Sequence, residues 1–225
     1  FVFPGGVRGP EDASVHARCR GLDAEEADRR LGVDAGGLDF YSAAIRELFE
    51  ETGVLLAVDA ADKWVGSEGP GPAPLADTRR RLQAGRLSWL GLLAAQGIEL
   101  AADRLHYVAH WETPVVLSAR FSTRFFVAEL PPGQQPVHDG EELIASRWLT
   151  PRGALALHRR GEIDLPFPHM KHLERLSRLP TPEALWGWAR ERWRAPVVKV
   201  RPWLIEARGE RRFVLPCEPG YPDEA

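Results

Sequence analysis

The sequence predicts an α+β fold in which helices and strands are mixed without a regular β-α-β alternation. The chain has 225 residues, of which 44% are hydrophobic and 27% are charged, a composition typical of a globular domain with a buried core. Its apolar runs fall far short of the roughly 20 residues that a membrane-spanning helix needs, so no membrane partner is expected. The irregular order of helical and strand-like segments favours layers of helices and sheet over a doubly wound parallel sheet.

Charge and cysteine content narrow the function classes. The chain carries 29 Lys and Arg residues against 32 Asp and Glu residues, a formal net charge of −3. Because no basic excess marks a nucleic-acid surface, we expect no nucleic-acid partner. The chain has two cysteines, Cys19 and Cys217, which are too few for disulfides to stabilise a fold of this size. A reducing compartment is therefore expected, and the sequence does not decide whether the two cysteines form a single disulfide.

The N-terminal part contains the clearest predicted helix. Residues 1–6 are expected to form the end of a strand and a tight glycine turn, and a short helix is expected near residues 23–30. Residues 39–53 have the strongest helical pattern. Asp39 is the expected N-cap of this helix, and Gly53 lies where a left-handed C-terminal residue is favoured.

The other predicted elements are short and mixed. Runs of β-branched and aromatic residues predict strands, and leucine periodicity and capping residues predict helices. The predicted strands cover residues 54–58, 105–111, 120–129, 145–149 and a final pair at 197–200 and 213–215. The predicted helices cover residues 75–97, 151–160, 169–178 and 183–194.

One face of the helix at residues 39–53 is acidic. Glu47, Glu50 and Glu51 are spaced i, i+3 and i+4, within an arc of roughly 100°. Such carboxylates repel one another by a few tenths of a kcal/mol per pair, so a helix that keeps them together favours a bound cation. Carboxylate oxygens suit Mg²⁺ or Mn²⁺ that also contacts substrate phosphates. The alternative is a solvated acidic face balanced by Arg46.

The residues around this face match a known signature. Residues 46–54, Arg-Glu-Leu-Phe-Glu-Glu-Thr-Gly-Val, match the second half of the Nudix box, G-x5-E-x7-R-E-U-x-E-E-x-G-U with U aliphatic. Phe3-Pro4-Gly5-Gly6 resembles the strand and turn that supply the first glycine of the box. The chain therefore resembles the Nudix hydrolase superfamily.

The first half of the box departs from that pattern. The position eight residues before Arg46 is Leu38 instead of glutamate. Residues 7–45, 39 residues, separate Gly6 from Arg46 where the signature has 13, so about 26 residues interrupt the box. Asp12, six residues after Gly6, is a candidate replacement for the missing glutamate.

A divided box of this kind resembles the Nudix motif 19 subfamily, which includes a peroxisomal coenzyme A diphosphatase. Downstream stretches of the chain resemble the same subfamily: Trp111-Glu112-Thr113-Pro114, residues 120–126, Leu149-Thr150-Pro151 and Leu165-Pro166-Phe167-Pro168. The resemblance implies one domain over residues 1–225, folded as a Nudix α/β/α sandwich with a mixed sheet. Within it we expect an insertion at 7–37 and a helical, lid-like segment at 75–106. We also expect further residues before Phe1.

The resemblance implies metal-dependent hydrolysis of a diphosphate linkage. The first expectation is coenzyme A or acyl-coenzyme A, cleaved to 3′,5′-ADP and (acyl-)phosphopantetheine. An alternative is ADP-ribose or another nucleoside diphosphate derivative, since Nudix chemistry is shared among several substrates. A third hypothesis, motivated by Leu38, is a catalytically weakened nucleotide-binding regulatory module. The expected partner is a small-molecule nucleotide substrate, and the sequence does not decide whether the chain forms a homodimer. A cytoplasmic location is expected.

The resemblance also implies roles for individual residues. Glu47, Glu50 and Glu51, with the Gly5 carbonyl, are the expected ligands of Mg²⁺ or Mn²⁺. Arg46 is expected to orient the box by pairing with a glutamate. The candidates for the general base are Glu47 and, from a later loop, Glu142 or Glu141, and the sequence does not choose between them.

Substrate contacts are assigned by chemical type. A basic residue is expected near the 3′-phosphate of coenzyme A, and the candidates are Arg120, Arg124 and Lys171. Aromatic residues that could stack on adenine, or instead belong to the core, are Trp111, Phe121 and Phe167. His169 and His172 are expected either to line the pocket or to be structural.

Overall fold

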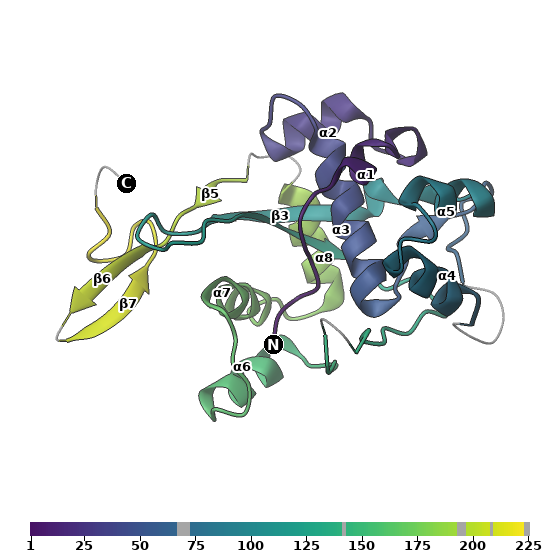
Figure 1. Cartoon of the computed structure of the whole chain (residues 1–225). Helices are drawn as coiled ribbons and strands as arrows, with labels where there is room; N and C mark the ends of the chain where they lie inside the picture. The colour runs from purple at the N-terminus through teal and green to yellow at the C-terminus, as the bar shows by residue number, and fades with distance from the viewer. Residues whose placement is uncertain (67–72, 141–142, 193–196, 208, 223–225) are drawn as a thin grey trace.

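The computed structural model describes residues 1–66, 73–140, 143–192, 197–207 and 209–222. A small sheet lies between two groups of helices, with α3 on one face and α7 and α8 on the other (Figure 1). This layered arrangement confirms the predicted α+β sandwich. No helix in the described part of the chain is long and apolar enough to cross a membrane. Cys19 and Cys217 are both free thiols, so the disulfide left open by the sequence is not formed.

The insertion is helical and packs on the signature helix. It contains α1 (Pro10–Ala13), a 3-10 turn (His16–Arg18) and α2 (Ala24–Leu31), and it leads into α3 (Gly37–Thr52). The predicted helix near residues 23–30 is confirmed, because Asp23 caps α2 by accepting a hydrogen bond from the Glu26 amide.

Helix α3 begins earlier than the sequence predicts. Its N-cap is Gly36 (φ 78°), so the expected cap Asp39 was wrong. Asp39 lies instead in the first turn, where its carboxylate contacts Arg8 and His16. Gly53 (φ 74°) ends the helix as predicted, in the left-handed conformation that glycine adopts without strain.

The buried face of α3 forms the centre of the core. Tyr41, Ile45 and Phe49, spaced four residues apart, are fully buried. The predicted helix at 75–97 is two helices, α4 (Ala73–Gln83) and α5 (Trp89–Gln96), separated near Gly85. Trp89, Leu92 and Leu93 of α5 belong to the same buried cluster as α3. Helix α5 is thus a core element, and a lid role for residues 75–106 stays a prediction.

The central sheet is mixed. Strand β3 (Leu105–Glu112) pairs antiparallel with β4 (Ser122–Ala128) and parallel with β5 (Lys199–Val200). On one face Phe126 packs against Tyr41 of α3, and on the other His106 packs against Trp186 of α8. The sheet is therefore covered by helices on both faces.

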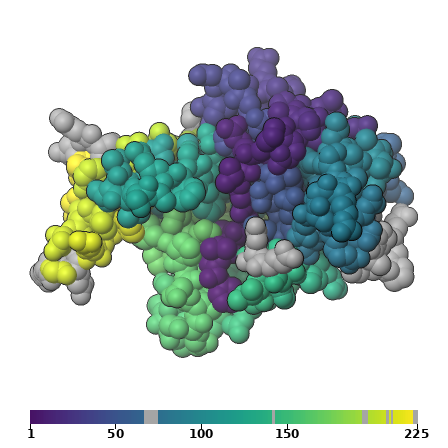
Figure 2. Space-filling model, viewed as in Figure 1, coloured from purple at the N-terminus to yellow at the C-terminus, as the bar shows by residue number. Residues whose placement is uncertain are grey.

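Several strand predictions were wrong. Strands are found in both segments of the predicted final pair, 197–200 and 213–215, but they do not pair with each other. Strand β5 joins β3, while β7 (Glu210–Val214) pairs with β6 (Trp203–Ala207). Residues 145–149 form no strand and are mainly exposed. Residues 1–6 also form no strand, and Figure 2 shows this purple N-terminal segment crossing the face between the blue helices and the green C-terminal part. The strand at 54–58 is reduced to two residues, β1 (Ala57–Val58), paired with β2 (Glu99–Leu100).

The later helices agree with the predictions to within a few residues. They are α6 (Pro151–Arg159), α7 (Phe167–Leu176) and α8 (Pro182–Glu191). Leu155 of α6 and Leu173 of α7 form a second, smaller buried cluster. The predicted end of the third helix, including Trp193, lies outside the described residues.

Candidate active site

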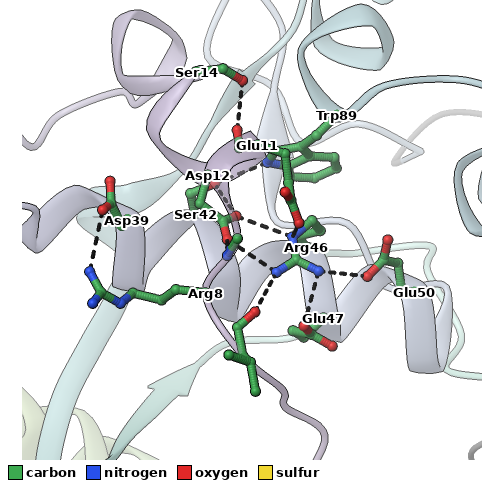
Figure 3. Close-up of polar contacts among 12 residues, drawn as sticks. Arg8, Glu11, Asp12, Ser14, Asp39, Ser42, Arg46, Glu47, Glu50 and Trp89 are labelled. Atoms are coloured by element: carbon green, nitrogen blue, oxygen red, sulfur yellow. Dashed lines mark hydrogen bonds and ion pairs between the residues drawn. The ribbon is translucent and has the colours of Figure 1, made fainter. Parts of the chain in front are cut away.

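Arg46 lies at the centre of the polar face of α3. Its side chain is only 7% exposed, and its Nη1 donates to Glu47 Oε1 and to Glu50 Oε2, both at 2.9 Å (Figure 3). The Nη2 atom donates to the carbonyl of Val7, 2.9 Å away, in the segment after the glycine turn. One guanidinium therefore holds two of the three signature glutamates side by side.

Asp12 supplies the countercharge from the other half of the box. Its fully buried carboxylate accepts hydrogen bonds from Arg46 Nε (3.2 Å) and Nη2 (3.1 Å) and from Ser42 Oγ (2.9 Å). The Ser42 hydroxyl in turn accepts from Trp89 Nε1 at 3.0 Å. Leu38, at the position of the missing glutamate, is buried in the core instead. The acid has thus moved from α3 to α1.

These contacts set the charge states of the cluster. Burial disfavours the Arg46 cation, but the hydrogen bonds and charge of Asp12 outweigh it, and the pKa of Arg46 is raised. Burial raises the pKa of the Glu50 carboxyl, and the neighbouring Glu47 charge adds to this while Arg46 opposes it. The face therefore combines a fixed cation with a carboxylate whose charge is destabilised.

The glycine turn touches two of the signature glutamates. The Gly5 amide donates to Glu51 Oε2 at 3.3 Å. A Cβ placed on Gly6 would lie 2.4 Å from the carboxylate of Glu47, a distance too short for any side chain. Any side chain at the second glycine of Phe3-Pro4-Gly5-Gly6 would therefore displace the Glu47 carboxylate from this position.

The donor set suits a hard divalent cation. Among the described residues, no three His, Cys, Asp or Glu side chains converge as a closed metal cage would require. Mg²⁺, however, is usually held by one or two carboxylates together with water and substrate phosphates. Glu47 and Glu50, held together on a partly buried edge of α3, fit such an open site.

The structure brings together three of the predicted substrate residues. Trp111, Phe121 and Phe167 line one cavity of about 270 Å³ at the far end of the β3–β4 hairpin. Lys171 is not among the lining residues. Its ammonium pairs with Glu174 (3.1 Å) and lies 5.4 Å from the centre of the Phe167 ring.

The other predicted residues lie elsewhere. Arg120 does not line the cavity. Arg124 is on the opposite face of β4 from the lining residue Phe125, with its Cζ 3.9 Å from the centre of the Phe40 ring. The base candidates Glu141 and Glu142 lie outside the described residues. The two histidines pack against Phe125, with ring centres 5.5 Å (His169) and 4.3 Å (His172) away.

Two arginines near the acidic face carried no signal in the sequence. The Arg8 guanidinium lies 4.0 Å from the centre of the Phe40 ring, which Arg124 also contacts. Arg79 of α4 donates to the Glu50 carbonyl (2.8 Å) and so fixes the last turn of α3. Both depend on packing between segments distant in sequence, which no local pattern reveals. Asp12, by contrast, was found by counting from Gly6.

Comparison with known families decides what this arrangement is. A profile described as the NUDT19 Nudix domain matches residues 10–176, more than half of the chain. The chain belongs to this family of Nudix hydrolases. The match includes Asp12, the helices α1 and α2 of the insertion and the three glutamates of the acidic face, and it begins after the glycine turn.

Relatives and a solved structure agree with this assignment. The chain is 27% identical over 239 residues to "Acyl-coenzyme A diphosphatase NUDT19" of Gallus gallus, covering 98% of this chain and 61% of that protein. It is 33% identical over 147 residues to the Homo sapiens protein of the same name, covering 61% of this chain and 39% of that one. The chain thus spans about three fifths of the length of the chicken relative and about two fifths of the length of the human one.

The fold comparison gives the same answer. A NUDIX hydrolase from Alicyclobacillus acidocaldarius matches with a TM-score of 0.64 and 25% sequence identity, covering 88% of this chain and 81% of that one. Most of the chain therefore shares the architecture of a solved Nudix hydrolase.

Proposed function

We propose that this Nudix hydrolase cleaves the diphosphate linkage of coenzyme A or acyl-coenzyme A to 3′,5′-ADP and (acyl-)phosphopantetheine. The observation that carries the proposal is the acidic edge of α3, where Arg46 holds Glu47 and Glu50 side by side against the glycine turn. The names of the two NUDT19 relatives support the choice of substrate.

The proposed cofactor is Mg²⁺ or Mn²⁺. Glu47, Glu50 and Glu51, together with the Gly5 carbonyl, are the proposed ligands. A divalent ion bound there supplies charge neutralisation for the diphosphate and a lowered pKa for the attacking water.

The protein groups position and deprotonate the nucleophile. Glu47 is the proposed proton acceptor, because its carboxylate lies against the glycine turn and is fixed by Arg46. A carboxylate is an adequate base for an acidified water. Glu142, with Glu141, is the alternative base. Arg46 is a positioning residue, since its donors are already used by Asp12, Glu47, Glu50 and Val7.

A pair of arginines is proposed to bind the anionic nucleotide end of the substrate. Arg124 is half-buried, and among the described residues its Nε has no hydrogen-bond partner. It shares the Phe40 ring with Arg8. Phe40 and Glu47 are seven residues apart on α3, so these guanidinium groups lie roughly 10 Å along the helix from the acidic edge. We propose Arg124 as the contact for the 3′-phosphate.

The test is hydrolysis of a substrate panel at saturating Mg²⁺. Coenzyme A, an acyl-coenzyme A and ADP-ribose are compared for wild type, Glu50→Gln and Glu51→Gln, with thermal unfolding as the control for folding. We expect turnover of the coenzyme A compounds and its loss in both variants. Turnover of ADP-ribose alone would move the proposal to the alternative substrate class. No turnover of any compound, with nucleotide binding retained, would favour the regulatory module.

The same panel separates the two candidate bases. Glu47→Gln and Glu142→Gln are each compared with wild type for hydrolysis and for Mn²⁺ binding by calorimetry. Glu47 is also a proposed ligand, so Glu47→Gln should lose both hydrolysis and Mn²⁺ affinity, and Glu142→Gln decides the question. Loss of hydrolysis with Mn²⁺ affinity kept in Glu142→Gln would make Glu142 the base, whereas wild-type hydrolysis in this variant would leave Glu47. If Glu50→Gln and Glu51→Gln both keep full activity, the metal assignment is wrong.

A further inference from the structure

The aromatic cavity lies apart from the acidic edge of α3 and has a different chemical character. It is lined by the β3–β4 hairpin, the start of α7 and the β6–β7 hairpin, which lie together at one side of the molecule (Figure 1). Its volume of about 270 Å³ is close to the lower end of the range for small-molecule pockets. Its principal side chains are aromatic: Trp111, Phe121, Phe125, Phe167 and Phe213.

The charged side chain of the cavity lining, Glu112, is already paired with two cations. Glu112 is bound by Lys199 Nζ at 2.9 Å and by the guanidinium of Arg201. These contacts hold the pKa of the Glu112 carboxyl at about 2, so it stays paired at neutral pH. Burial lowers the pKa of His169 to about 4, so this imidazole is neutral. A ligand of this cavity is therefore expected to be uncharged and largely apolar.

The lining nevertheless includes unused hydrogen-bonding atoms. Among the described residues, Trp111 Nε1 and His169 Nδ1 are buried without a hydrogen-bond partner. A pure hydrocarbon would leave both atoms unpaired, whereas a carbonyl group accepts a hydrogen bond from an N–H donor. An apolar chain that carries one neutral carbonyl satisfies both features of the lining.

A short segment joins the cavity to the acidic edge. The Phe3 ring packs against two lining residues, with ring centres 6.5 Å from Phe125 and 4.8 Å from His169. Two residues later the Gly5 amide contacts the Glu51 carboxylate. Two residues of extended chain span at most about 7 Å, so the cavity is within reach of a long substrate whose diphosphate lies at the glutamates.

The closing wall comes from outside the matched domain. Phe213 of β7 packs against Phe167 with ring centres 5.3 Å apart. It lies beyond residue 176, where the match to the NUDT19 Nudix domain ends. The C-terminal hairpin therefore converts an open aromatic surface of the domain into a cavity.

We propose that this cavity binds the acyl chain of an acyl-thioester substrate, with the thioester carbonyl near Trp111 and His169. The proposal rests on the proposed function and names the apolar part of its substrate. A buried methylene contributes enough transfer free energy to change affinity roughly fourfold. The KM of acyl-coenzyme A should therefore fall below that of coenzyme A, by about fourfold for each methylene that enters the cavity.

The test compares two exposed positions of the same hairpin turn. Phe121 lines the cavity and is 61% exposed, while Val116 does not line it and is 60% exposed, so an aspartate at either position is compatible with folding. Phe121→Asp should remove the preference for acyl-coenzyme A over coenzyme A in kcat/KM. Val116→Asp should keep the wild-type ratio. Phe213→Ala, which opens the closing wall, should reduce the ratio as well.

A binding measurement makes the result independent of catalysis. The probe is a dansyl-labelled medium-chain acyl amide, whose fluorescence rises in an apolar site. We expect binding to wild type and Val116→Asp and at least tenfold weaker binding to Phe121→Asp. If no coenzyme A compound is hydrolysed but this pattern appears, the cavity proposal stands and the proposed function fails. If acyl-coenzyme A is hydrolysed with no dependence on chain length and Phe121→Asp binds the probe normally, the cavity proposal is overturned.

Discussion

Arg46 and Asp12 form a buried two-point ion pair that joins the two halves of a divided Nudix box. The guanidinium Nε and Nη2 atoms lie 3.2 and 3.1 Å from the two carboxylate oxygens of Asp12. Their side chains are 7% and 0% exposed. Despite the interruption of about 26 residues, the charge of Arg46 is therefore paired, because Asp12 of α1 supplies the carboxylate that α3 lacks at Leu38.

The first prediction concerns the loss of this acid. Asp12→Ala leaves the buried Arg46 charge without its main partner, and breaking a buried pair in this way costs about 3–5 kcal/mol. We expect the free energy of unfolding in urea to fall by that amount, and hydrolysis to be lost because Arg46 no longer fixes Glu47 and Glu50.

The neighbouring residue provides the control. Glu11 also approaches Arg46, at 3.6 Å, but its side chain is 40% exposed. Exposed ion pairs contribute at most about 1 kcal/mol, so Glu11→Ala should have a small effect. Equal losses for the two variants would contradict the assignment of Asp12 as the structural partner of Arg46.

The second prediction concerns the close approach of the glycine turn. Gly6→Ala places a methyl group 2.4 Å from the Glu47 carboxylate, which must move. A displacement of about 1 Å in a catalytic group costs on the order of 100-fold in rate. We expect a loss of that size in kcat/KM with little change in Tm, because a flexible side-chain end can shift without disturbing the core. Gly187→Ala is the matched control, since a Cβ at Gly187 meets no atom within 4 Å. A Gly6→Ala variant with wild-type activity would show that the Glu47 carboxylate is not used where the structure places it.

Local patterns were sufficient for the acidic helix and its partner. The spacing of Glu47, Glu50 and Glu51 and the left-handed Gly53 are properties of one continuous segment. Asp12 could be found because the signature fixes its distance from Gly6. The start of α3 was misjudged because Asp39, a good capping residue, is used instead for contacts with Arg8 and His16.

Long-range pairing could not be predicted in the same way. Strand β5 is two residues long and is held by parallel pairing with β3, which lies almost 90 residues earlier in the chain. The cavity combines Trp111, Phe167 and Phe213 from three separate elements. The sequence indicated Trp111 and Phe167 separately, as stacking or core residues, and Phe213 only as part of a strand, and no spacing rule brings the three together. The Phe40 ring between Arg8 and Arg124 is a further contact of this kind.

The third prediction tests the proposed role of Arg124. A hydrogen bond to a charged group contributes about 1.5–3 kcal/mol, which is at least tenfold in affinity. Arg124→Gln should raise the KM for coenzyme A by tenfold or more and leave the KM for dephospho-coenzyme A nearly unchanged. Arg120→Gln is the comparison, because Arg120 is exposed, whereas Arg124 is half-buried and its guanidinium lies over the Phe40 ring. An equal rise for both substrates would assign Arg124 to another part of the nucleotide.

The last prediction concerns stability in acid. Burial lowers the pKa of His169 and His172 from the ordinary value of 6.5 to about 4. Between these values the unfolded chain binds protons that the folded protein does not, so the free energy of unfolding falls as the pH drops from 6.5 towards 4. Urea midpoints measured across this range should show the decline, and His172→Phe should reduce its slope, because phenylalanine keeps the packing against Phe125 without a titrating group. The Glu112 carboxyl loses its contribution in a more acidic range, between its ordinary pKa of 4.5 and about 2, so its effect is separable. An unchanged slope in His172→Phe would show that this imidazole is already protonated in the folded protein.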